Sequence, residues 1–84
     1  MNERFLLPTT QLQRELADLA KAEQDIADGQ TRITRLELRI EQLRVGGRNT
    51  VRLEELLATF RDTLGQWNAH RLEILRTIER LRTA

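Results

Sequence analysis

The stretch RVGGRNTVRLEE, residues 44–55, lies at the middle of the 84-residue chain and decides its fold. It holds two of the chain's four glycines, Gly46 and Gly47, side by side. Adjacent glycines suit a tight turn, whereas glycine-rich loops with basic flanks can also cradle phosphates. No Gly-Lys-Ser/Thr sequence follows, as a P-loop requires. We therefore interpret the pair as a turn, in which Gly46 takes the left-handed conformation that closes a helix and Gly47 lets the chain reverse.

The residues before this turn have the pattern of one long helix. Residues 10–45 contain no proline and a single glycine, and they are rich in residue types that favour helices. Thr10 and Gln13, which follow Pro8, form a capping box. Apolar residues recur at spacings of three, four and seven, which is the period of a helical face: Leu12, Leu16, Leu19, Ile26, Ile33, Ile40 and Leu43. The sequence predicts a helix over residues 10–45, preceded by an N-terminal extension at residues 1–9.

The residues after the turn repeat the pattern. Asn49 or Thr50 can cap a second helix, and the apolar stripe continues at Leu53, Leu57, Phe60, Leu64, Trp67, Ile74, Ile78 and Leu81. This predicts a turn at residues 46–49 and a helix over residues 50–82. So short a connection makes antiparallel neighbours. The predicted fold is therefore all-α: residues 1–84 form one domain, an antiparallel, coiled-coil-like two-helix hairpin.

A turn centred near Gly47 fixes which residues of the two helices face each other. Glu23 and Arg71 then meet across the hairpin at stripe positions, and we expect them to form a buried polar layer that specifies the register. Gly29 faces residues 65–67 and is expected to make room for the ring of Trp67. In this register six facing pairs are opposite in charge: Glu41–Arg52, Arg39–Glu55, Arg32–Asp62, Glu23–Arg71, Asp18–Arg76 and Glu15–Arg80.

The apolar stripes are wider than a single hairpin requires. A two-helix coiled coil needs a narrow stripe, and a wider one is typical of helices in a four-helix bundle. We therefore expect the hairpin to pair as a homodimer into a four-helix bundle, or to dock a helical protein partner. The residues expected at that interface are Leu36, Leu43, Leu56, Leu72 and Leu75. Phe5, Leu6 and Leu7 form a further apolar cluster, expected to cover the bundle end, with a flexible recognition tail as the alternative.

The composition offers little for catalysis. The chain has no cysteine, no tyrosine and one histidine, His70, so thiolate metal sites and disulfides are excluded. Glu23, Gln30 and Glu37 repeat at heptad spacing on the first stripe, but the Glu-x-x-His pairs of di-metal bundles are missing. We expect no catalytic residue, no metal site and no cofactor, and hence no enzyme.

The arginines near the turn are the only charge feature with functional content. Residues 31–52 hold six arginines against two glutamates, although the whole chain carries a formal charge of only +1. Arg35, Arg44 and Arg48 lack a partner in the predicted register and are candidates for phosphate contacts. Without interleaved aromatic residues this is a weak nucleic-acid signal. The favoured function is a protein–protein interaction module of scaffold, adaptor or chaperone type, and a weak nucleic-acid-binding hairpin is the alternative.

The sequence also predicts where the protein acts. No apolar run approaches the ~20 residues that span a membrane. The first residues, MNERFLLP, carry charges of both signs and lack the apolar region of a signal peptide. We expect a cytoplasmic protein that does not associate with membranes.

Overall fold

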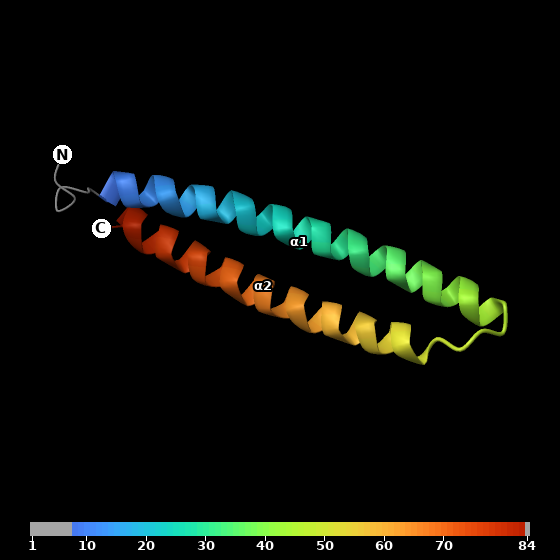
Figure 1. Ribbon diagram of the computed structural model, residues 1–84. Helices are drawn as coiled ribbons and strands as arrows, with labels where there is room; N and C mark the ends of the chain where they lie inside the picture. Colours follow the sequence, from blue (N-terminus) through green and yellow to red (C-terminus); the bar gives the residue numbers. More distant parts are fainter. Residues whose placement is uncertain (1–7, 84) are drawn as a thin grey trace.

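Two long helices form the described part of the chain. The computed structural model describes the backbone of residues 8–83 and the side chains of residues 10–83. Helices α1 (Pro8–Val45) and α2 (Val51–Thr83) lie antiparallel, side by side, and residues 8–83 contain no strand (Figure 1). The hairpin is a rod of 63 × 22 × 15 Å. The predicted all-α antiparallel hairpin is confirmed.

Helix α1 begins at Pro8, two residues before the predicted start. Proline suits the first helical turn because its missing N–H would have no partner there and its fixed φ is already helical. Thr10 therefore lies inside the first turn instead of capping it. The expected roles of Phe5, Leu6 and Leu7 lie outside the described residues.

The end of α1 is closed by Gly47, one residue later than predicted. Gly47 has a φ of 73°, whereas Gly46 has no positive φ. The N–H of Arg48 donates to the carbonyl of Leu43 at 2.8 Å, and the N–H of Gly47 donates to that of Arg44 at 2.9 Å. These two bonds define a Schellman motif, which satisfies carbonyls left unpaired at the helix end.

Thr50 caps the start of α2. Its carbonyl accepts the N–H of Glu54 at 2.9 Å, which is the first bond of the helix. The side chain of Asn49 accepts the N–H of Val51 at 3.0 Å, so both predicted capping residues contribute. Thr50 is also buried, which anchors the turn against the end of the hairpin.

The apolar core lies along the line of contact between the helices and is divided into two clusters. Near the open end, where α1 begins and α2 ends, Ala22, Ile74 and Ile78 are buried together, with Leu12 and Leu19 packed against them. Near the turn, the cluster consists of Ile33, Ile40 and Leu57, flanked by Leu36, Leu53, Phe60 and Leu64. No large side chain among residues 10–83 is fully buried. The core is therefore a thin strip rather than an enclosed interior.

Gly29 and Trp67 lie between the two clusters. A Cβ atom added to Gly29 would lie 3.1 Å from Cζ3 of Trp67 and 3.5 Å from Cδ1 of Leu64. Ordinary contacts between carbon atoms are about 3.5–4.0 Å. The predicted pairing of this glycine with the tryptophan ring is confirmed. It shows which residues of α1 and α2 lie at the same height along the hairpin.

Candidate functional site

The line of contact between the helices has two different sides. One, the ion-pair side, carries all three interhelical ion pairs found among residues 10–83: Arg44–Glu54, Glu37–Arg61 and Glu23–Arg71. The other, the groove side, is hollowed between Phe60 and Trp67 of α2 and Arg32 of α1. On α1, Arg32 and Glu37 are separated by about 140° around the helix axis at 3.6 residues per turn. The two features therefore occupy opposite sides of the hairpin.

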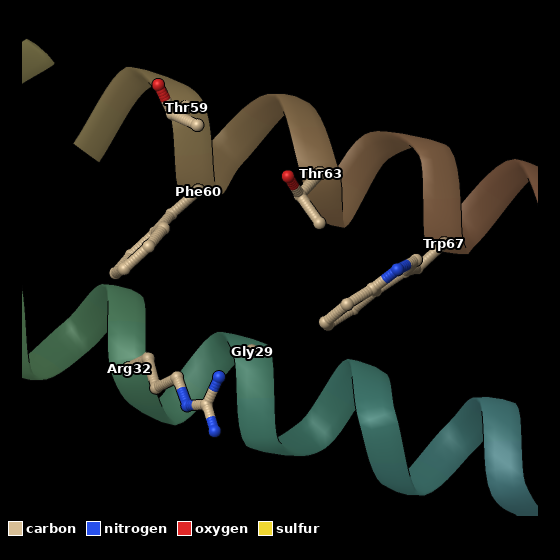
Figure 2. A pocket seen from close by; sticks show the side chains of 6 residues that line it. All are labelled: Gly29, Arg32, Thr59, Phe60, Thr63 and Trp67. Atoms are coloured by element: carbon tan, nitrogen blue, oxygen red, sulfur yellow. The ribbon is translucent and has the colours of Figure 1, made fainter. Parts of the chain in front are cut away.

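The groove is small and mainly apolar. Figure 2 shows the rings of Phe60 and Trp67 pointing from α2 toward α1, with Thr63 directed into the gap between them. Gly29 adds no side chain, so the gap stays open, with a volume of about 230 Å³. Sites for small-molecule ligands usually measure about 300–1,000 Å³. The groove is therefore smaller than most such sites.

The leucines predicted to form one interface do not share a surface. Leu36 packs against the hairpin's own core cluster, and Leu43 and Leu75 are half-buried. Leu56 and Leu72 are 41% and 47% exposed. They are separated by about 24 Å along α2 and about 160° around it, given a rise of 1.5 Å and a rotation of 100° per residue. Leu56 belongs to the groove side, and Leu72 lies on the opposite side of the helix.

Other exposed apolar residues were missed by the periodicity. Leu38 and Val45 are exposed, and they lie one above the other because seven residues make about two helical turns. Both fall outside the predicted stripe, on the outer surface of α1. Leu16, predicted as a stripe residue, is also exposed near the open end. Apolar surface is thus distributed over several faces of the rod.

Glu23 and Arg71 do meet across the hairpin. Nη2 of Arg71 donates to Oε2 of Glu23 at 3.2 Å. The two side chains remain 50% and 39% exposed, so the pair lies beside the core and not within it as expected. The reason is the narrow core, which leaves the flanks of each helix open to water. Such a pair can favour one register, but its contribution to stability is modest.

The other five predicted ion pairs are absent from the described residues. The pairs that form instead, Arg44–Glu54 and Glu37–Arg61, are offset by about one helical turn from the predicted register. Glu23–Arg71 and the facing of Gly29 with Trp67 keep the predicted register, so α2 as a whole is not displaced by a turn. The difference lies in the side of the helix: Glu37 and Arg44 lie on the ion-pair side of α1, whereas Arg32, and Arg39 two turns later, lie on the groove side.

Arg44, predicted to lack a partner, lies in an ion pair with Glu54. Its guanidinium pairs with Oε1 of Glu54, while Oγ1 of Thr50 donates to Oε2 of the same carboxylate at 2.8 Å. The hydroxyl of Thr50 lowers the pKa of Glu54, desolvation opposes this, and the charge of Arg44 lowers the pKa further. Arg35 and Arg48 are exposed and form no ion pair among residues 10–83.

The described residues hold no metal-binding constellation. No three side chains of the His, Cys, Asp or Glu type converge closely enough among them to hold a metal ion. His70 is exposed on α2. Neither α1 nor α2 contains an apolar stretch of the length and hydropathy needed to cross a bilayer.

Comparison of the chain with protein-family models, curated proteins and solved structures found no match.

Proposed function

We propose that the chain is a non-enzymatic protein–protein interaction module of the cytoplasm, of scaffold, adaptor or chaperone type. Its hairpin packs against helices of a second copy or of another protein. The observation that carries the proposal is the incomplete core, since no large side chain of residues 10–83 is fully buried and Leu56 and Leu72 are nearly half exposed. Small domains bury too little surface to gain much stability alone.

The free energy gained by burying these leucines against a partner is appreciable compared with the stability of a small protein. Fully burying a leucine side chain is worth about 1.5–3 kcal/mol, so covering the exposed part of Leu56 or Leu72 is worth about 1 kcal/mol each. Total stabilities of natural domains are only about 5–15 kcal/mol. If the partner is a second copy, a two-fold dimer forming a four-helix bundle is favoured, because closed dimers are the commonest assembly.

Sedimentation equilibrium over a range of micromolar concentrations tests the proposal for self-association. We expect a mass above that of the 9.9 kDa chain and a melting temperature that rises with protein concentration, because only the folded form associates. A stable monomer whose melting temperature is independent of concentration would contradict self-association.

The alternative proposal, weak binding of nucleic acid at the turn, rests on Arg35 and Arg48. Both are exposed and free of ion pairs among the described residues, as is Arg52 near the start of α2. A phosphate at Arg44, the third predicted contact, would have to compete with the carboxylate of Glu54. We therefore retain the interaction module as the leading proposal.

A further inference from the structure

Four charged residues of α1 form a row on the groove side. Asp18, Asp25, Arg32 and Arg39 follow one another at seven-residue spacing. Seven residues complete about two helical turns, so the four side chains lie nearly in line over about 30 Å. Arg32 lines the groove, which places the row on that side of the hairpin (Figure 2).

These four charges have almost no partners within the hairpin. Asp25 pairs with Lys21 of the same helix at 3.1 Å, and no other member of the row is in an ion pair among residues 10–83. In an antiparallel helical pair, residues flanking the core normally face charged residues of the other helix. Here α2 presents, at heptad spacing on the same side, the uncharged or weakly basic residues Leu56, Thr63, His70 and Thr77. On the ion-pair side, by contrast, charged residues of α1 pair with charged residues of α2.

The order of the row is self-complementary. Two acids are followed by two bases, and the midpoint falls between Asp25 and Arg32, beside Gly29. If two copies of α1 lie antiparallel about that midpoint, Asp18 faces Arg39 of the second copy and Asp25 faces Arg32 of the second copy. Two-fold symmetry then repeats both pairs. A parallel, in-register arrangement would instead place like charges together.

We propose that the groove side is the self-association surface, and that two hairpins join antiparallel with their α1 rows in contact about Gly29. The inference rests on the proposed function, which it deepens by naming the partner, the surface and the orientation. The groove between Phe60 and Trp67 lies at the centre of this surface and is covered by the second copy. Flanking charges of this kind set the register and orientation of associating helices.

Complementary charge variants test the row directly. Asp18→Arg with Asp25→Arg makes the row entirely basic, and Arg32→Asp with Arg39→Asp makes it entirely acidic. Each variant alone should associate at least about tenfold more weakly than wild type at low salt, because four attractive contacts become repulsive. A 1:1 mixture should form a heterodimer of near wild-type affinity. Circular dichroism verifies that each variant keeps its helicity.

A matched control separates the row from a general effect of net charge. Glu55→Arg with Asp62→Arg changes the net charge by the same amount as the basic row variant, but on exposed positions of α2 that form no ion pair among the described residues. The dissociation constant of this control should stay within about threefold of wild type, because its charges lie outside the proposed contact.

A single introduced cysteine tests the orientation, since the chain has none of its own. Asp28→Cys lies at the midpoint, so its thiol should be joined to that of the second copy by a short bis-maleimide cross-linker. Gln42→Cys lies about 20 Å from the midpoint and should not be joined, because antiparallel packing separates the two copies of this residue by about 40 Å.

The outcomes distinguish this inference from the proposed function. If the wild-type chain dimerises but the row variants associate as tightly as wild type, the antiparallel row is wrong and self-association still holds. The same conclusion follows if the basic and acidic variants form no heterodimer when mixed. Cross-linking through Gln42→Cys and not Asp28→Cys also overturns the antiparallel row. A wild-type chain that stays monomeric by sedimentation equilibrium removes self-association itself, and the row with it.

Discussion

Substitutions at Gly29 and Gly65 separate the packing role of a glycine from its helix propensity. Both residues lie inside helices, where replacing glycine by alanine gains about 1 kcal/mol. An added Cβ at Gly65 meets nothing within 4 Å, whereas at Gly29 it would lie 3.1 Å from the ring of Trp67. The two alanine variants therefore gain the same propensity but differ in the contacts that the added methyl group makes.

The expected values follow from that difference. Gly65→Ala should stabilise the hairpin by about 1 kcal/mol, which is about 4–8 °C in melting temperature for a domain of this size. Gly29→Ala should be close to neutral, because the ring of Trp67 must shift toward the groove to admit the methyl group. Gly29→Leu should destabilise by up to about 2 kcal/mol, since overpacking costs about 1–3 kcal/mol and the gain in helix propensity offsets about 1 kcal/mol of it.

Thermal unfolding at one fixed protein concentration measures all three variants, and the fluorescence of the sole tryptophan reports the contact itself. We expect the emission of Trp67 to change in both Gly29 variants and to stay unchanged in Gly65→Ala. If Gly29→Ala stabilises as much as Gly65→Ala and leaves the emission unaltered, the close approach of Gly29 to the ring is wrong.

Three further predictions concern charged residues. Alanine substitutions of Glu23 and Arg71 in a double-mutant cycle should give a coupling of about 0.2–1 kcal/mol, as for other exposed pairs, and no coupling would mean that the pair does not form. Because the pKa of Glu54 is lowered in the folded state, its carboxylate stabilises the hairpin above pH 4.5 and loses this effect as the pH falls. Urea unfolding should show a smaller decline below pH 4.5 in Glu54→Gln than in wild type, and equal declines would contradict this. If the turn binds nucleic acid, replacing Arg35 and Arg48 by glutamine should lower the slope of log affinity against log salt by about 0.7–0.9 for each lost phosphate contact, whereas equal binding by both proteins would exclude these residues.

The two helices and their antiparallel arrangement could be predicted from the sequence because they depend on signals summed over many residues. The apolar stripes and the Gly46–Gly47 pair together determine two helices and a reversal, and an error of one residue in either changes nothing. The facing of Gly29 and Trp67 followed from the register set by the turn, which the structure keeps at this level.

Ion pairs and surfaces depend on finer detail and could not be predicted in the same way. An apolar stripe is defined by many residues, whereas an ion pair depends on the position of two particular side chains around and along their helices, as for Arg44 and Glu54. The groove is the space between two aromatic rings that the folded hairpin brings together. The spacing of residues along the sequence does not predict it. The heptad row that includes Arg32 was readable in the sequence, but its significance depends on which charges the hairpin leaves unpaired.

The elongated shape of the hairpin has a consequence for scattering and hydrodynamic measurements. Its Cα radius of gyration is 19.1 Å, whereas a compact chain of 84 residues would have about 12 Å. A single hairpin will therefore elute from a gel-filtration column ahead of globular proteins of equal mass. Two hairpins packed antiparallel at the usual helix separation of about 10 Å have a radius of gyration less than about 1 Å larger than one. Dimerisation on the groove side should thus double the forward scattering while the radius hardly changes, whereas end-to-end association would increase both.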